Sequence, residues 1–394
     1  MTITIDQHRD WIAKAAEVAA VLAEDALARD LAGAEPVAEA QLLRESGLPA
    51  LLIPAELGGA GGTWRTALAV VRELAKADGS IAQLLGYHYV NQVNLWLVGG
   101  TAVQESFGRE SAAGQFLWGD AVNPIEPDLE LEPDGDGYLL SGKKSFATGA
   151  SVGDVTLIAG AVRGTGEPLL AVVRRDWPGV EFGGDWDNLG MRLSASGSVT
   201  YTGVRVPADH VIGSLASDRT TPRSSLITPA IQAVFGSLYL GIAEGALETA
   251  RDYTRSISRP WVLSGIAQAT HEPYVLATYG DLVAGTAATG ALADRIADHL
   301  VEAMDRGPGL TWEERGELAV EVAALKVVAT DLALKVTSTV YEVTGARATS
   351  NRVGLDRFWR NVRTHTLHDP VAYKRREVGD HYLNGAHPKF TLYT

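Results

Sequence analysis

The chain has 394 residues, of which 46% are hydrophobic, so it can bury a sizeable core as two or three structural domains or one large composite. Its 48 acidic and 34 basic residues give a net charge of -14, which repels a phosphate backbone and argues against nucleic acid as a partner. The absence of cysteine excludes disulfides, thiolate catalysis and cysteine-ligated metal sites. Any chemistry must therefore use histidine, carboxylates, hydroxyls or a cofactor.

The sequence gives no sign of export or membrane insertion. Residues 1–9 are polar and acidic and lack the basic region and apolar run of a signal peptide. Apolar stretches such as residues 318–334 carry charged side chains, among them Lys326, so none resembles a bilayer-spanning helix. Together with the lack of cysteine, these features predict a cytoplasmic protein with no membrane partner.

Residues 1–114 are predicted to form an N-terminal α-helical domain. Apolar side chains recur near helical spacing from Trp11 to Leu27. Further helical patterns cover residues 38–45, 63–77 and 80–97.

Residues 115–215 are predicted to form a middle β domain. Short alternating runs, such as residues 138–141 and 155–159, are separated there by Gly, Asp and Pro. About a hundred residues is an ordinary size for one domain.

Residues 216–394 are predicted to form a C-terminal helical bundle. Helical periodicity returns in residues 229–256, 271–304 and 311–344. The last segment begins with Thr311 and Glu314 at capping-box spacing and stops at Gly345, a natural helix end. The order of helices, strands and again helices predicts an α+β fold. The Ala-rich helix faces suit close packing, including packing between subunits.

Several motifs, in this order, resemble those of acyl-CoA dehydrogenases. They are residues 43–48, 53–62, 77–82, 142–150, 189–192 and 204–207. Each motif alone is weak, but their ordered occurrence over three differently textured regions is hard to produce by chance. The resemblance implies an N-terminal helical domain, a middle β-barrel or sandwich and a C-terminal four-helix bundle around a flavin.

The resemblance assigns two residues of the 142–150 motif to the flavin. Phe146 falls where the family places an aromatic ring against the isoalloxazine, and Thr148 where a hydroxyl meets the N5/O4 edge. An aromatic face offers stacking area, and a hydroxyl can donate or accept as N5 changes its redox state. The alternative is that Phe146 is a core residue and Thr148 an ordinary strand residue.

The residue expected to be the dehydrogenase base is changed in this chain. Many acyl-CoA dehydrogenases carry a glutamate where this sequence has Asp369, followed by Pro370. Aspartate is one methylene shorter, so its carboxylate is drawn back by roughly an ångström from a reaction that needs near contact. Proline further restricts the residue before it.

The segment around Asp369 instead resembles the branch of the superfamily that includes dibenzothiophene monooxygenase. The matching stretches are residues 86–89, 185–187, 255–261 and 363–374. This likeness implies a two-component monooxygenase that receives reduced FMN from a separate NAD(P)H-dependent flavin reductase. It would react the reduced FMN with O2 to give a C4a-hydroperoxyflavin and oxygenate sulfur or nitrogen of a small, aromatic or heteroatom-containing substrate. FAD is the less favoured cofactor.

The same resemblance predicts the site residues. His368, His88 and Asn123 are the catalytic candidates, since an imidazole or amide can hold the oxygen species and an imidazole can supply a proton. Water must be kept from such a species, so residues 185–198 could act as a lid. The candidate cofactor ligands are Phe146, Thr148, Asn123, His368, Arg259 at the FMN phosphate, and Gly345 with Arg347, the last from a neighbouring subunit. The candidate substrate pocket consists of His88, Trp186 and Trp96.

Other interpretations stay open at this point. A histidine on a helix is more often structural than catalytic, and His365, His381 and His387 fit that description. No metal is predicted, because His365 and His368 lack a third ligand. The rival functions are an FAD-dependent acyl-CoA dehydrogenase with Asp369 as base and a non-catalytic flavin or acyl-CoA binding protein. A homotetramer is expected from the resemblance.

Overall fold

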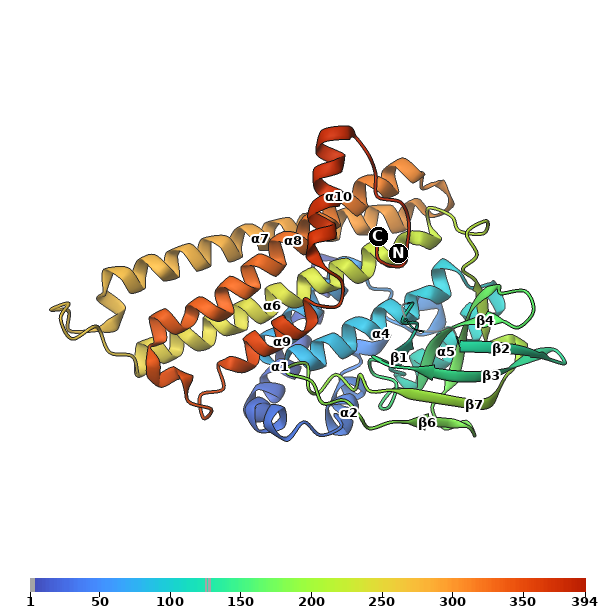
Figure 1. The fold of residues 1–394 in the computed structure, drawn as a ribbon, viewed down its shortest axis with the longest axis horizontal. Helices are drawn as coiled ribbons and strands as arrows, with labels where there is room; N and C mark the ends of the chain where they lie inside the picture. Colours follow the sequence, from blue (N-terminus) through green and yellow to red (C-terminus); the bar gives the residue numbers. More distant parts are fainter. Residues whose placement is uncertain (1–3, 125, 127–128) are drawn as a thin grey trace.

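The computed structural model describes residues 4–124, 126 and 129–394. Helices, a central sheet and a second set of helices follow one another along the chain, which confirms the predicted α+β fold class (Figure 1). The long C-terminal helices extend away from the sheet, and the shorter N-terminal helices lie against both parts.

The N-terminal region is helical, as the periodicity predicts. Its helices are α1 (Ile5–Ala32), α2 (Val37–Ser46), α3 (Trp64–Ala77), α4 (Gly79–Leu97) and α5 (Thr101–Gly114). The carboxylate of Asp78 separates α3 from α4, because it accepts hydrogen bonds from the backbone N–H groups of Ser80 and Ile81 and so caps α4. Helix α4 is buried along almost its whole length.

The central strands form an eight-stranded sheet within the described residues, in the order β6-β7-β3-β2-β4-β5-β8, with β1 pairing with β4. The strands are β1 (Trp118–Ala121), β2 (Leu129–Asp134), β3 (Gly137–Lys144), β4 (Val155–Val162), β5 (Pro168–Arg174), β6 (Val180–Phe182), β7 (Val199–Val206) and β8 (Val211–Ser214). Strand β4 pairs parallel with β1 and β2, and the other pairings are antiparallel.

The two faces of the sheet belong to different apolar clusters. Leu157 on β4 packs in the cluster that contains Leu95 of α4 and Phe107 of α5. Its neighbour Ile158 belongs to the cluster on the opposite face, with Leu140 of β3. This alternation follows from the two-residue period of a strand, and it fixes α4 and α5 against one face of the sheet.

The C-terminal region contains three long helices and two short ones in the described part of the chain. They are α6 (Ile227–Ser256), α7 (Pro273–Arg306), α8 (Trp312–Thr344), α9 (Asp356–His365) and α10 (Val371–Asn384). The predicted Thr311–Glu314 capping box begins α8, and Gly345 follows its last residue. Short 3₁₀ helices are Leu48–Ala50, Ala55–Leu57, Ala208–His210, Ser224–Leu226, Ala269–His271, Gly307–Gly309 and Ala346–Thr349.

Glycines bring α6 close to α3. A Cβ at Gly241 would lie 2.2 Å from the carbonyl oxygen of Arg72, and one at Gly245 would lie 2.1 Å from that of Lys76. No larger residue fits without moving the backbone. The two helices therefore pack at a separation that only glycine permits.

Helix α6 is the most apolar of the long helices. By length and composition alone the stretch Ser224–Ser256 could cross a membrane. However, 89% of its most apolar window is buried inside the protein, as in the central helix of a globular core. Its apolar character is thus explained by packing against α3, α4 and α8.

Candidate active site

A cavity of about 700 Å³ lies between the sheet and the helices. Its walls come from α4, from strands β1, β4 and β5, from the beginning of α6, from the end of α9 and from the C-terminal segment. The lining is mostly apolar with a few convergent polar groups, which is the usual composition of a small-molecule site. Among the predicted site residues, it brings together Asn123, Phe146, Thr148, Trp186 and His368.

Two aromatic rings form one corner of this cavity. The rings of Phe146 and Trp186 meet edge to face with centroids 5.9 Å apart. The indole N–H of Trp186 donates to the carbonyl oxygen of Met191 at 2.7 Å, which fixes the ring. Phe146 has a left-handed φ of 55° and is 59% exposed. A core residue would be covered, so Phe146 instead presents an aromatic face to the cavity.

Thr148 belongs to a buried chain of hydroxyl groups beside the aromatic corner. Its Oγ1 lies 2.8 Å from Oγ of Ser196, which in turn lies 2.7 Å from Oγ of Ser194. The amide of Gln83 donates to Thr148 Oγ1 at 3.4 Å. These contacts hold the threonine hydroxyl at the cavity wall.

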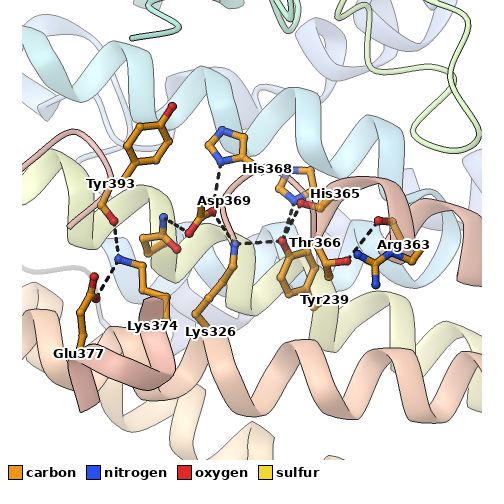
Figure 2. Close-up of polar contacts among 11 residues, drawn as sticks. Tyr239, Lys326, Arg363, His365, Thr366, His368, Asp369, Lys374, Glu377 and Tyr393 are labelled. Atoms are coloured by element: carbon orange, nitrogen blue, oxygen red, sulfur yellow. Dashed lines mark hydrogen bonds and ion pairs between the residues drawn. The ribbon is translucent and has the colours of Figure 1, made fainter. Parts of the chain in front are cut away.

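His368 reaches the cavity and is held by Asp369 (Figure 2). Its Nδ1 lies 3.2 Å from Oδ1 of Asp369, and the same oxygen accepts a hydrogen bond from Lys326 Nζ of α8 at 3.0 Å. Burial opposes ionisation of Asp369, yet the charges and hydrogen bonds of His368 and Lys326 outweigh it and hold the pKa of Asp369 well below its usual range. A carboxylate at Nδ1 keeps the proton on that nitrogen and leaves Nε2 for the cavity.

Asp369 is therefore not placed as a dehydrogenase base. It is only 5% exposed, its oxygens are occupied by His368, Lys326 and Gln232, and it does not line the cavity. A base must reach the substrate proton within hydrogen-bond distance. The alternative of an acyl-CoA dehydrogenase that uses Asp369 is consequently wrong for this geometry.

A second histidine lines the cavity beside His368. The rings of His365 and His368 are stacked with centroids 6.0 Å apart, and His365 Nδ1 lies 2.9 Å from the hydroxyl of Tyr239. Burial, followed by the nearby His368 and Lys326, lowers the pKa of His365 well below its usual value. His365 is thus a neutral imidazole at the cavity wall.

Asp120 on β1 is a further acidic group of the lining. Burial raises its pKa to about 7, against the opposing effects of the Val122 backbone N–H and the charge of Lys144. A carboxyl group in this range can hold a proton at neutral pH. Nothing in the local sequence distinguished this strand residue.

Some polar atoms of the lining are buried without a hydrogen-bond partner among the described residues. They are Oε1 of Gln83, Nδ2 of Asn91, Oγ1 of Thr364 and Nε2 of His365. Buried polar atoms are normally paired, so such a group of unpaired ones at one cavity indicates a polar ligand. Together with the aromatic corner, they fit a planar ring that carries both donors and acceptors, as a flavin does.

His88 lies outside this cavity, contrary to its predicted catalytic and substrate-binding roles. Its ring is completely buried, with Nε2 2.8 Å from the carbonyl oxygen of Pro49 and Nδ1 accepting from the backbone N–H of Trp118 at 3.0 Å. Burial lowers its pKa to about 4, with the Pro49 hydrogen bond opposing and Arg44 adding to the shift. His88 is thus a neutral residue that ties α4 to the 3₁₀ helix Leu48–Ala50 and to the start of β1.

Trp96 also lies away from the cavity. It packs with apolar side chains of α5 and of the 3₁₀ helix Ala55–Leu57. Its ring lies against Gly108, where an added Cβ would be 2.9 Å from the Trp96 ring. The helical periodicity of α4 could not show which face of this almost fully buried helix meets the cavity. Trp96 is a packing residue here and does not line the described cavity.

Arg259, Gly345 and Arg347 lie at the opposite end of the helical bundle. Helix α6 begins at the cavity and runs 30 residues, about 45 Å, before Arg259 follows it. The hydroxyl of Ser258 donates to the carbonyl oxygen of Thr344, so the loops that carry the two arginines lie side by side. Both arginines are exposed, and neither has an ion-pair partner within the described ranges. They cannot reach the cavity of their own chain.

The proposed lid, residues 185–198, is only partly exposed. The backbone N–H of Met191 donates to Asn361 Oδ1 of α9 at 2.8 Å, and Arg192 Nε donates to the Asp30 carbonyl of α1 at 2.8 Å. Asp185 accepts from both the backbone N–H and the hydroxyl of Ser198 at 2.7 Å. These anchors restrict any lid motion to the few residues around Trp186.

Comparison with known proteins agrees with this geometry. The models of the acyl-CoA dehydrogenase N-terminal and C-terminal domains match residues 6–115 and 233–372. The chain is 42% identical over 377 residues to dibenzothiophene monooxygenase of Rhodococcus erythropolis, covering 92% of this chain and 90% of that one. It is 39% identical to a probable FMNH2-dependent monooxygenase, SfnC, of Pseudomonas putida, covering 98% of each.

A solved structure gives the same result. The FMN-bound TdsC from Paenibacillus sp. A11-2 superposes with a TM-score of 0.95 at 40% identity, covering 98% of this chain and 100% of that one. The chain belongs to the acyl-CoA dehydrogenase family, as its motifs predicted. Within that family it is a flavin-dependent monooxygenase, which confirms the predicted enzyme class.

Proposed function

We propose that the cavity holds reduced FMN and that the protein uses it with O2 to oxygenate the sulfur of a small aromatic thioether. The observation that carries this proposal is His368, whose Nδ1 is held by a buried carboxylate while its ring lines the cavity. The aromatic corner of Phe146 and Trp186 suits a flat apolar substrate. A relative that is 42% identical to this chain is named for dibenzothiophene, which is such a thioether.

The residues of the cavity divide into those that hold the cofactor and those that act on oxygen. Phe146 supplies a face for the isoalloxazine, while Thr148 and Asn123 offer a hydroxyl and an amide to its polar edge. Reduced FMN, when bound, supplies the electrons with which one atom of O2 is transferred and the other leaves as water. Phe146, Thr148 and Asn123 are therefore the residues that would hold the flavin ring.

The protein's own chemical step is a proton transfer at Nε2 of His368. The oxygen atom that leaves as water needs protons, and an imidazole is suited to supply one near neutral pH. The carboxylate of Asp369 stabilises the imidazolium and keeps its ring in place, and Lys326 keeps Asp369 ionised. The apolar walls exclude water from this step.

The cofactor phosphate is bound by a neighbouring subunit. Arg259 and Arg347 lie at the far end of their own bundle, where an assembled oligomer can present them to the next cavity. A guanidinium matches phosphate oxygens in shape and charge. The protein is accordingly a homo-oligomer, with a tetramer as the expected form. It is a cytoplasmic enzyme whose reduced FMN comes from a separate NAD(P)H-dependent reductase.

The proposal is tested with purified protein, an aromatic thioether and reduced FMN mixed without oxygen and then exposed to an oxygen pulse. A transient flavin absorbance band followed by sulfoxide formation is expected, with product measured by chromatography. Tight copurification of FAD that an acyl-CoA reduces would contradict the proposal. Binding of FMN without any oxygenated product from thioether, amine or indole substrates would instead indicate a non-catalytic binding protein.

A further inference from the structure

A group of potential metal ligands lies outside the flavin cavity. It consists of Glu317 on α8, His381 on α10 and His387 in the segment that follows α10. One ligand atom from each residue can be chosen so that all of them lie within 4.8 Å of one another. Glu317 is 70 residues from His387 in the sequence, and the docking of α10 and the C-terminal segment on α8 brings it to the two histidines.

The spacing of the ligand atoms fits a small divalent cation. His387 Nε2 lies 2.8 Å from one carboxylate oxygen of Glu317, and His381 Nε2 lies 3.7 Å from the other. Zinc bonds of roughly 2.0–2.2 Å in a tetrahedron separate neighbouring ligand atoms by about 3.3–3.5 Å. The observed distances lie on either side of that value. Shifts on the order of an ångström would therefore bring both imidazoles and the carboxylate onto one ion.

The imidazole of His381 has no hydrogen bond of ordinary length among the described residues. Its Nε2 is too far from Glu317 for one, and its Nδ1 is buried without a partner. The two imidazole rings lie nearly parallel, with centroids 5.1 Å apart and an interplanar angle of 17°. A cation between these rings and Glu317 would give Nε2 of His381 a partner at bonding distance.

The backbone of α8 leaves room for this arrangement. A Cβ at Gly316 would lie 2.5 Å from Cγ of His387, so the imidazole rests in a notch that a larger residue would fill. The neighbouring Arg315 holds the same C-terminal segment, because its guanidinium donates to the Thr394 carbonyl at 2.6 Å and lies over the ring of Phe390. The segment is thus already seated beside the ligand group.

We propose that Glu317, His381 and His387 bind a Zn²⁺-like divalent cation that fastens the C-terminal segment to α8 and α10. Two imidazoles and one carboxylate are a usual zinc donor set, and water would complete the tetrahedron. The segment continues to Tyr393, which lines the flavin cavity with its ring 6.3 Å from that of His368. The cation therefore stabilises one wall of the active site from outside.

The test uses the full chain without a histidine tag, dialysed against EDTA and titrated with zinc chloride in a calorimeter. One equivalent of Zn²⁺ per chain is expected, together with a rise in melting temperature. Co²⁺ should give the visible absorption of a tetrahedral site. The substitutions H381A and H387A should each raise the zinc Kd by more than the roughly 10–100-fold that loss of an outer-shell partner costs.

A matched control is available on the neighbouring helix α7. His299 of α7 pairs with Glu321 of α8 at 2.6 Å but is not part of the three-ligand group, so H299A should leave zinc binding unchanged. E317Q changes an exposed side chain and should weaken binding without unfolding the protein, as circular dichroism and FMN binding would verify. Absence of stoichiometric binding in the parent protein, or full binding in both H381A and H387A, would overturn the proposal.

Discussion

The imidazole of His368 and the carboxylate of Asp369 are adjacent in the sequence, and their side chains are hydrogen-bonded, with Nδ1 3.2 Å from Oδ1. The same carboxylate oxygen accepts a hydrogen bond from Lys326 on α8. A line of polar contacts therefore runs from the core of the bundle to the cavity wall (Figure 2). Because the sequence neighbour supplies the contact, the imidazole and its orienting group move as one unit.

Replacing His368 with phenylalanine should remove the proton donor while leaving the ring's packing against Phe235, where the centroids are 4.8 Å apart. We expect product formation to fall by roughly 10²–10⁴-fold, as for loss of a general acid. Hydrogen peroxide release should rise as oxygen is reduced without transfer. Stopped-flow and peroxide assays on H368F measure both quantities. The control is H271F, at an exposed position of the 3₁₀ helix Ala269–His271, and equal product yields in the two variants would contradict the role of His368.

Replacing Lys326 with methionine should leave Asp369 as a buried carboxylate without its cation. Lys326 is completely buried and the Asp369 side chain is 6% exposed, so solvent cannot compensate. We expect a loss of roughly 3–5 kcal/mol of unfolding free energy, measured by urea denaturation. The double variant K326M/D369N should recover much of that loss, because it removes both charges.

The same double variant separates stability from catalysis. It should remain slow, because an asparagine at position 369 no longer fixes the imidazole tautomer through a carboxylate. Recovery of full activity together with stability would show that Asp369 does not position His368. A single K326M variant as stable as the parent would show that the ion pair contributes nothing to folding.

Replacing His88 with phenylalanine should affect folding rather than chemistry. The variant leaves the Pro49 carbonyl and the Trp118 N–H unpaired, at about 1–3 kcal/mol each. Because burial lowers the His88 pKa from 6.5 to about 4, the folded parent binds fewer protons than the unfolded chain between these values. Its contribution to stability is thus present above pH 6.5 and is lost as the pH falls toward 4.

Melting temperatures at pH 7.5 and pH 5 measure this effect. The gap between parent and H88F should be larger at the higher pH, and the folded variant should retain its turnover per bound flavin. A variant with unchanged stability but no product formation would instead show that His88 takes part in catalysis.

Replacing Arg259 with alanine should weaken FMN binding in the cavity of the neighbouring chain. If each site combines His368 of one chain with Arg259 of the next, coexpressed R259A and H368F chains form some sites with both groups intact. Random mixing gives about a quarter of such sites, and activity should recover to a similar fraction. Separately purified variants mixed without subunit exchange are the control, and no recovery on coexpression would place Arg259 outside the site.

Much of the fold and part of the site could be predicted from the sequence. Helix ends depend on local rules, and the Thr311–Glu314 capping box is present as predicted. Phe146, Thr148 and His368 could be located because each stands within a continuous motif of the family. A motif carries its own backbone geometry, so its residues keep their relation to the cavity.

The remaining residues depend on packing between distant segments, which one sequence does not reveal. Lys326 is 43 residues from Asp369, and its only signal was a charge inside an apolar helical run. His88 was misassigned because α4 is buried on nearly every side, so periodicity could not select the face toward the cavity. Asp120 lies on a short strand whose alternation resembles that of any other strand.

The unpaired amide and imidazole atoms of Gln83, Asn91 and His365 also bear on how much of this enzyme a cell retains. Each such atom costs about 1–3 kcal/mol while it lacks a partner, and a ligand that supplies the partners favours the native state by mass action. Proteases remove the unfolded fraction, so small changes in stability alter the steady-state amount of a protein. We therefore expect flavin starvation to deplete the protein itself, beyond slowing its turnover.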